Sequence, residues 1–353
     1  MSADLYCTHL DYIIEKTMII SRIAIHQPAG LLRILTDEGL EGRCTGVAAT
    51  VAGADAAEAA SILINANPVD RERIWLAFNE ADGSVPADLR ACIDVALWDL
   101  TARIAGRPIH RHVNGFRNRI PVCRRSELNS AEEIVEEAEE AQGAGFRAYK
   151  FDALLDEESL IGLIRDVRRA VGPDFCLLLD GRARWILDQA IRIGRALDAA
   201  DFFCFDRPRP DNDISGGRQL AAEIDTPTST GVSSPMEAAQ VMTAQAADHI
   251  RTEVTRAGGM TDVLKAARCA EAFGAYCHLD GLGICDGFAH LHLAGASRNT
   301  PFLEVADGTS SAPFIDNPLQ ICDGYIEVPA APGLGMEIDM GAVNEHTTEL
   351  IES

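Results

Sequence analysis

The sequence predicts an α/β fold in which a closed barrel of parallel strands follows a smaller α+β unit. Three observations support this: a repeated strand-then-helix pattern, charged residues at the ends of several strands, and no glycine-rich loop after the first strand. From about residue 119 onward, short apolar runs alternate with helix-like segments. Continuous apolar runs of this kind are typical of parallel strands that are buried on both faces.

The repeat has the length of a βα unit, and its strand-like runs end in most cases at a residue that can do chemistry. By subtraction of residue numbers the ends lie 30, 26, 26, 21, 25 and 26 residues apart. Seven or eight such units favour a barrel, since an open doubly wound sheet would normally carry a glycine-rich phosphate loop. The chemistry of a closed barrel takes place at the rim where the strands end. The residues predicted at these ends are Lys150, Asp180, Asp206, Val232, Glu253, His278 and Glu304.

The first 118 residues do not follow the repeat and are predicted to form a unit of their own. Residues 20–25 and 31–35 have strand composition, and the turn at 37–39 sends the chain back in a meander. Residues 55–78 and 87–104 have helical periodicity. We therefore expect an α+β domain at residues 1–118.

The barrel is expected at residues 119–315. Its first strand starts near Pro121, and the glutamate-rich segment 131–143 is expected to be a solvated helix. The remaining segment, residues 316–353, lies beyond the repeat. Its strand-like run at 324–329 is expected to return to the N-terminal domain.

Composition limits the class of partner and the compartment. The formal net charge of −23 argues against nucleic acid and anionic membranes, because both would be repelled. No apolar run approaches the roughly 18 residues needed to span a bilayer. The ten cysteines are spread singly with no CxxC pair, which favours buried reduced thiols. We expect a cytoplasmic protein that acts on a small molecule.

Four segments carry a resemblance to a known family. They are the run Ile93–Leu100 (IDVALWDL), the turn Ala257–Thr261 (AGGMT), Asp323–Ile326 (DGYI) and Pro332–Gly335 (PGLG). Together with the acids at the strand ends, they resemble the enolase superfamily, and most of all its mandelate racemase and muconate lactonizing enzyme branch. The resemblance implies a modified TIM barrel, (β/α)7β, under an α+β capping domain, and a homo-oligomer. It also implies Mg²⁺ and the removal of a proton next to a substrate carboxylate.

The metal ligands implied by the resemblance are incomplete. Asp180 and Asp206 match the first two, and oxygen ligands of this kind suit a hard cation. The third position holds Val232, followed by Ser233, whose hydroxyl is a possible replacement. The metal site is therefore expected to be degenerate, with weak or absent Mg²⁺ and with Arg182 or Arg207 turned toward the acids.

Three charged residues at the rim are predicted to contact the substrate: Asp152, Arg182 and Arg207. A guanidinium can hold a carboxylate through two parallel hydrogen bonds without a metal. An alternative is that the two arginines pair with Asp180 and Asp206 and form an inert rim.

The catalytic residues implied by the resemblance are Lys150, Glu253, His278 and Glu304. Lys150 matches the first lysine of the family's Lys-x-Lys, whereas Asp152 replaces the second. His278 is the predicted general base, with Glu253 expected to hydrogen-bond its imidazole and raise its basicity. Glu304 matches the residue that hydrogen-bonds the substrate carboxylate.

A base on one face of the substrate favours elimination over racemisation. The predicted function is a lyase or isomerase of this superfamily, most of all a sugar-acid dehydratase. Two alternatives remain open at this point. One is a homologue that binds a carboxylate without metal-dependent turnover, and the other is a structural subunit of a mixed oligomer.

Overall fold

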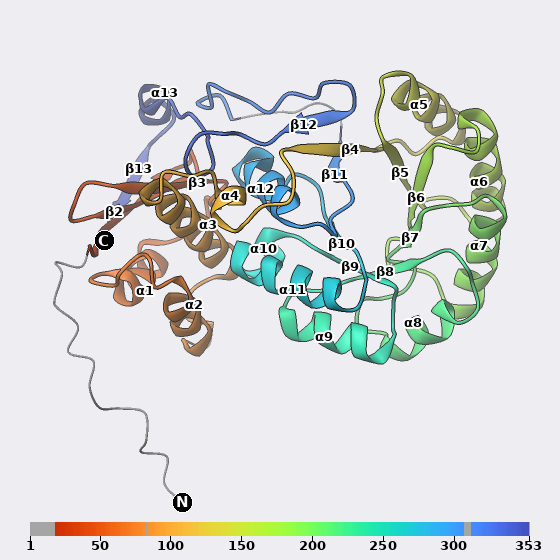
Figure 1. Cartoon of the computed structure of the whole chain (residues 1–353), viewed down its shortest axis with the longest axis horizontal. Helices are drawn as coiled ribbons and strands as arrows, with labels where there is room; N and C mark the ends of the chain where they lie inside the picture. Colours follow the sequence, from red (N-terminus) through yellow and green to blue (C-terminus); the bar gives the residue numbers. More distant parts are fainter. Residues whose placement is uncertain (1–17, 82, 307–311, 353) are drawn as a thin grey trace, which may run out of the picture.

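The computed structural model describes residues 18–81, 83–306 and 312–352. It has a capping domain on one side and a barrel on the other, as Figure 1 shows. Within the described residues, no helix is long and apolar enough to cross a membrane. The α/β class, the barrel and the separate N-terminal domain agree with the sequence prediction.

The capping domain is a four-stranded antiparallel sheet covered by helices. The strand order is β13-β1-β2-β3, so the last strand of the described chain lies beside the first. Helix α3 packs on β3 so closely that a Cβ at Gly42 would lie 2.0 Å from the carbonyl oxygen of Ala96. The strands are β1 Ile20–Gln27, β2 Leu31–Thr36, β3 Glu41–Thr45 and β13 Glu349–Glu352; the helices are α1 Gly53–Leu63, α2 Arg71–Glu80, α3 Ala87–Ile104, α4 Ile109–His112 and α13 Met340–Glu345.

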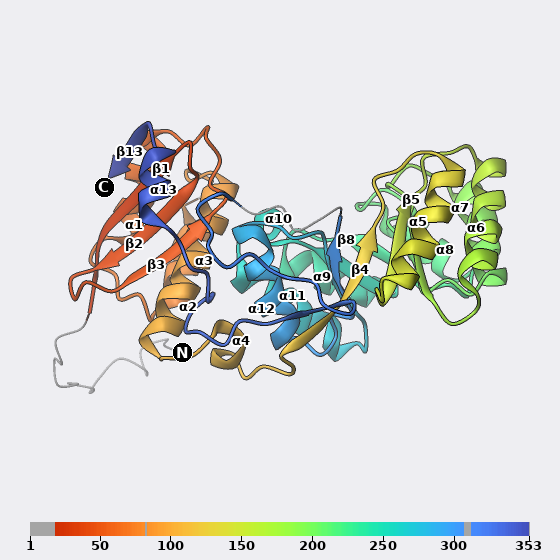
Figure 2. The same ribbon diagram turned by 90° about the horizontal axis from the view of Figure 1, so that it is seen from above.

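The barrel has eight parallel strands, and it is closed by pairing of the eighth strand with the first. In chain order the strands are β4 Arg119–Arg125, β5 Ala148–Asp152, β6 Cys176–Asp180, β7 Cys204–Asp206, β8 Thr228–Gly231, β9 His249–Thr252, β10 Cys277–Leu279 and β11 Leu303–Val305. The helices around them are α5 Ala131–Gly143, α6 Glu157–Val171, α7 Leu187–Ala199, α8 Ile214–Ala221, α9 Pro235–Ala244, α11 Met260–Ala272 and α12 Phe288–Ala296. Figure 2 shows helices α5 to α8 along the outer side of the barrel.

Helix α6 shows how a barrel helix with one apolar face forms. Helix α6 begins where the Asp156 side chain accepts a hydrogen bond from the Ser159 backbone N–H, and it ends at Gly172, whose φ is 75°. Glu157 and Glu158 lie in its first turn and Arg168 and Arg169 in its last, as the helix dipole favours. The face toward the strands carries Leu160, Leu163, Ile164, Val167 and Val171, all of which are buried.

Two short segments connect the capping domain to the barrel mouth. Helix α10, Val254–Ala257, follows β9 and contacts α3 of the capping domain. The 3-10 turn η1, Cys285–Gly287, follows β10 and contacts β3. Both segments follow the carboxyl ends of barrel strands, so the capping domain lies against the rim at which chemistry is expected.

The C-terminal segment differs in part from the sequence prediction. The strand expected at 324–329 is β12, Tyr325–Glu327, and it pairs antiparallel with β4 of the barrel rather than with the capping domain. Only β13, at the end of the described chain, joins the capping sheet, through β1. The segment therefore covers the start of the barrel before it reaches the capping domain.

A candidate active site at the barrel mouth

Four polar residues form one row across four neighbouring strands. The register pairs Asp152 with Asp180, Asp180 with Asp206, and Asp206 with Ser229. Because paired residues on parallel strands point to the same side, the row turns its side chains toward one place at the strand ends. The Ser229 hydroxyl donates a short hydrogen bond to Asp206 Oδ1. The sequence analysis had not singled out Ser229.

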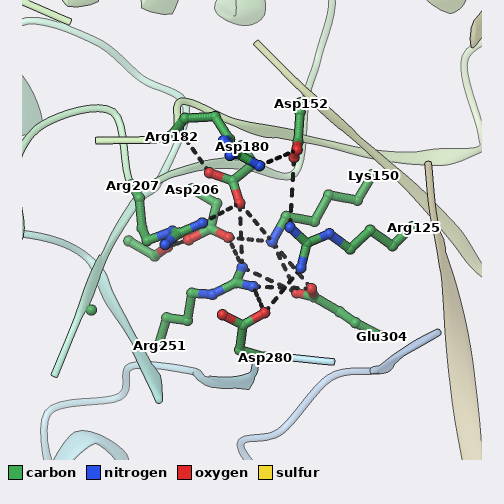
Figure 3. Close-up of polar contacts among 12 residues, drawn as sticks. Arg125, Lys150, Asp152, Asp180, Arg182, Asp206, Arg207, Arg251, Asp280 and Glu304 are labelled. Carbon is green, nitrogen blue, oxygen red and sulfur yellow. Dashed lines mark hydrogen bonds and ion pairs between the residues drawn. The ribbon is translucent and has the colours of Figure 1, made fainter. Parts of the chain in front are cut away.

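Lys150 lies at the centre of these acids and is fully buried. Its Nζ donates a short hydrogen bond to Asp206 Oδ2 and lies 3.1 and 3.2 Å from the two carboxylate oxygens of Glu304. Asp180 Oδ2 is 3.7 Å away. The structure therefore brings together four of the predicted site residues, namely Lys150, Asp180, Asp206 and Glu304 (Figure 3).

A second buried cation, Arg251 of β9, enters the same cluster. It ion-pairs at short range with Asp206 and with Asp280, and its two terminal nitrogens lie 3.4 and 3.3 Å from the Glu304 carboxylate. Figure 3 shows its guanidinium facing Lys150 across the acids. Sequence reasoning missed Arg251. The available signal was an arginine inside a predicted barrel strand, where a charge is rarely buried unless it is paired.

The arginines after β6 and β7 pair with acids, but only Arg207 pairs with one of the two acids named in the predicted alternative. Arg207 Nη2 lies 2.8 Å from Asp180 Oδ2, which confirms the prediction that an arginine turns toward these acids. Arg182 Nη1 instead donates to Asp152 Oδ2 at 2.7 Å, and its backbone N–H donates to Asp180 Oδ1 at 2.8 Å. A Cβ at Gly181 would lie 2.6 Å from the Cα of Pro208, so glycine lets these two loops approach.

The rim is completed by Asp280, just after β10, and Arg125, at the end of β4. Arg125 Nη1 donates to Asp280 Oδ1 at 3.1 Å, and its Nη2 lies 3.8 Å from Asp152 Oδ1. The connected network thus contains equal numbers of acids and bases. The acids are Asp152, Asp180, Asp206, Asp280 and Glu304, and the bases are Arg125, Lys150, Arg182, Arg207 and Arg251.

The ion pairs hold Asp206, Lys150 and Asp280 in their charged forms. Burial alone would raise the pKa of Asp206, but Arg251 and Lys150 outweigh it and hold that pKa well below its usual range. Burial and Arg251 both act to lower the pKa of Lys150, but Asp206, Glu304 and Asp180 raise it overall. At the rim, Arg251 outweighs burial and lowers the pKa of Asp280 to about 2. Near neutral pH, Lys150 therefore keeps its proton, and Asp280 is ionised but is a weak base.

The residues present do not fit the Mg²⁺ that the resemblance implies. Val232, at the third ligand position, is buried in an apolar cluster with Val241 and Ile250. Ser233 donates its hydroxyl to Glu237 at 2.9 Å. Among the described residues, no group of three or more His, Cys, Asp or Glu side chains is arranged to hold a metal ion.

The charge balance of the site explains why Mg²⁺ does not fit there. The inner acids Asp180, Asp206 and Glu304 are already matched by Lys150, Arg207 and Arg251. A divalent cation placed among them would add two uncompensated charges in a buried site, and this is strongly unfavourable.

The predicted pairing of His278 with Glu253 is wrong. Glu253 caps helix α10 and accepts hydrogen bonds from the backbone N–H groups of Thr255 and Arg256. His278 Nε2 is buried without a hydrogen-bond partner, and its ring packs edge-on against Phe203 and beside His249. Burial is the main cause that lowers the pKa of His278 to about 3.

His278 is misplaced because β10 ends later than the apolar run suggested. Strand β10 runs to Leu279, and the backbone N–H of Asp280 donates to the carbonyl oxygen of Thr252. Side chains alternate along a strand, so His278 and Asp280 face the same side at successive levels. Asp280 is the rim residue, and His278 lies one level deeper.

An open cavity of about 720 Å³ lies above this network. It is lined by residues that follow β4, β5, β6, β10 and β11, and all of these strands end at the mouth. The charged residues in its lining are Arg125, Glu127, Asp152 and Arg182. Lys150 and Arg251 do not line it. A ligand in the cavity would therefore meet Arg125 and Arg182 before it met the buried cluster.

Comparison with known proteins identifies the family. Residues 14–112 match the N-terminal domain of the mandelate racemase / muconate lactonizing enzyme family, and residues 133–342 match the domain described as enolase C-terminal domain-like. The chain therefore belongs to the mandelate racemase / muconate lactonizing enzyme family of the enolase superfamily.

Relatives in this family include dehydratases, epimerases and racemases. L-talarate/galactarate dehydratase from Salmonella typhimurium is 28% identical over 301 residues, which are 81% of this chain and 73% of the relative. L-Ala-D/L-Glu epimerase from Clostridium acetobutylicum is 25% identical over 329 residues, covering 87% and 90%. The crystal structure of L-talarate dehydratase from Polaromonas sp. JS666, complexed with Mg and L-glucarate, has a TM-score of 0.81 and 25% identity, covering 96% of this chain and 99% of that one.

Proposed function

We propose that this protein is a lyase that takes the proton next to the carboxylate of a sugar acid and eliminates water. The observation that carries the proposal is the mouth cavity, in which Arg125 and Arg182 present two partly exposed guanidiniums. A guanidinium binds a carboxylate through parallel hydrogen bonds. Relatives with the names talarate/galactarate dehydratase and arabinonate dehydratase support the substrate class.

The proposal includes turnover without Mg²⁺. The place of the cation is taken by Lys150 and Arg251, which neutralise the inner acids. The negative charge that develops on the substrate carboxylate would be met at the rim by Arg125 and Arg182. Fixed cations aimed at the place where charge develops are an effective means of lowering a barrier.

A second candidate is a protein that binds a carboxylate without turning it over. The observation that favours it is the saturation of the site, because Lys150 and Glu304 bond each other and Asp280 bonds Arg251 and Arg125. Binding alone would need only the cavity and its guanidiniums. The two candidates predict the same ligand and differ in chemistry.

Hydrogen exchange separates the two candidates. The protein is incubated in D₂O with galactarate, L-glucarate or arabinonate, with EDTA in one arm and Mg²⁺ in the other, and the α-hydrogen signal is followed by NMR. The proposal requires loss of that signal and formation of a dehydrated keto acid at equal rates in both arms. Exchange only with Mg²⁺ would overturn the metal-free part, and binding by calorimetry without exchange would favour the second candidate.

A cytoplasmic location and a homo-oligomer are also part of the proposal. The cysteines in the described residues are free thiols, as expected in a reducing compartment. The oligomer rests on the family resemblance. Sedimentation equilibrium of the purified protein tests it, since a single monomeric species would exclude it.

A further inference from the structure

We propose that Asp152 is the general base of this site, an inference that rests on the proposed lyase function. Asp152 ends strand β5, lines the mouth cavity, and has a side chain that is only 10% exposed. Its Oδ2 accepts from Arg182, whereas its Oδ1 has no hydrogen-bond partner. Among the buried polar atoms of the described chain, this is the one carboxylate oxygen left without a partner.

An unpartnered carboxylate oxygen in a buried position is costly, since a buried polar group normally finds a hydrogen bond. Arg125 Nη2 approaches Asp152 Oδ1 to 3.8 Å, which is too far for a hydrogen bond. The oxygen itself is buried and keeps an unused lone pair, in a residue that lines the cavity. A general base needs this arrangement: it must reach the proton that it removes without first breaking a bond of its own.

The other titratable residues near the site are less suited to act as the general base. Lys150 is fully buried and bonded to acids, and Glu253 is occupied by the N-terminus of α10. Asp280 is bonded to both Arg251 and Arg125. His278 lies among the aromatic side chains below the network and does not line the cavity.

Substrate binding would change the charges around Asp152. A carboxylate that binds to Arg125 and Arg182 neutralises the two guanidiniums that approach the Asp152 carboxylate and brings a like charge beside it. A neighbouring like charge favours the protonated form of a carboxyl group. The bound substrate therefore assists proton transfer to Asp152.

Asp152 alone can accept and return the proton that the elimination of water requires. Asp152 Oδ1 takes the α-proton, and the C–H electron pair becomes the enolate, whose charge lies on the carboxylate oxygens held by Arg125 and Arg182. The bond from the β-carbon to its hydroxyl oxygen then breaks with its electron pair, and the departing oxygen takes the proton back from Asp152. Water leaves, the enol product becomes the 2-keto acid, and no oxidant or reductant is consumed.

The test compares Asp152→Asn with Asp166→Asn, the same change at an exposed carboxylate of helix α6 that does not line the cavity. We expect Asp152→Asn to slow α-hydrogen exchange by about 10²–10⁴-fold, the range typical of a lost general base. Its affinity for galactarate, measured by calorimetry, should be unchanged or tighter, because a competing acid near Arg182 has been removed. Asp166→Asn should retain the exchange rate of the unmodified protein.

Chemical rescue excludes a purely structural role. Formate added to Asp152→Ala should restore part of the exchange, because a small carboxylate can occupy the vacated place. If Asp152→Asn exchanges at the unmodified rate, or if it loses exchange and formate does not rescue Asp152→Ala, the inference is overturned. If the unmodified protein binds the acids but exchanges none of their α-hydrogens, the proposed function fails first, and this inference fails with it.

Discussion

Replacing Arg251 with methionine should destabilise the protein more than any single change at a surface ion pair. Arg251 is 1% exposed and contacts Asp206, Glu304 and Asp280. The substitution leaves the buried network with one uncompensated negative charge. Removing one partner of a buried ion pair typically costs about 3–5 kcal/mol.

The matched control is Arg195→Met, because Arg195 also pairs with a carboxylate, that of Glu223, but at the surface. The two side chains of that pair are 62% and 52% exposed. Exposed pairs contribute about 0–1 kcal/mol, so this variant should unfold close to the unmodified protein. Urea unfolding followed by circular dichroism compares the two variants. Their midpoints are comparable if the slope of the free energy of unfolding against urea concentration is the same for both.

A double variant tests whether charge balance is the cause. Arg251→Met with Asp206→Asn removes one charge of each sign, so it should be less destabilised than the sum of the two single variants, by about 1 kcal/mol or more. The reasoning is refuted if Arg251→Met unfolds at the same urea concentration as Arg195→Met. It is also refuted if the two buried changes are strictly additive.

Three further outcomes are expected. Burial lowers the pKa of His278 to about 3, against about 6.5 in an unfolded chain, so only the unfolded chain takes up a proton between these values. The free energy of unfolding should therefore fall as the pH drops below about 6.5. His278→Phe should flatten this pH dependence in thermal unfolding from pH 7 to 4.5, and an unchanged dependence would count against the assignment. Arg182→Gln should weaken galactarate binding about tenfold by calorimetry, because it removes a charge-assisted hydrogen bond of about 1.5 kcal/mol. Equal affinity would mean that the substrate carboxylate binds elsewhere. Gly181→Ala should lower the midpoint of thermal unfolding, because the new Cβ would overlap Pro208 at a cost of about 1–3 kcal/mol. An unshifted midpoint would mean that the loops after β6 and β7 separate freely.

The barrel could be predicted from the sequence because its signal is local and repeated. Each strand is a short apolar run, and runs such as Leu177–Leu179 are buried on both faces. A charged residue directly after such a run can hardly lie anywhere but the strand end. Asp180 and Asp206 are the last residues of β6 and β7, as predicted, whereas Lys150 and Glu304 lie inside β5 and β11. All four still meet in one cluster.

The missed residues depend on register and pairing, which a local pattern does not contain. Arg251 of β9 pairs with Asp280, which follows β10, and a local pattern does not show this pairing. His278 was assigned to the rim because it follows an apolar run, but the strand continues past it to Leu279. The missing third ligand at Val232 stays a prediction, whereas the pairing of Lys150 and Arg251 with the inner acids is seen only in the structure.

The central claim is that buried cations replace the divalent cation of this family. Calorimetric titration of the purified, EDTA-treated protein with Mg²⁺ tests it most directly, with an L-talarate dehydratase of the family titrated alongside as the positive control. The account predicts no saturable heat for this protein and a saturable isotherm for the control. A saturable isotherm of one Mg²⁺ per chain at micromolar concentration, lost in Asp180→Asn, would contradict it.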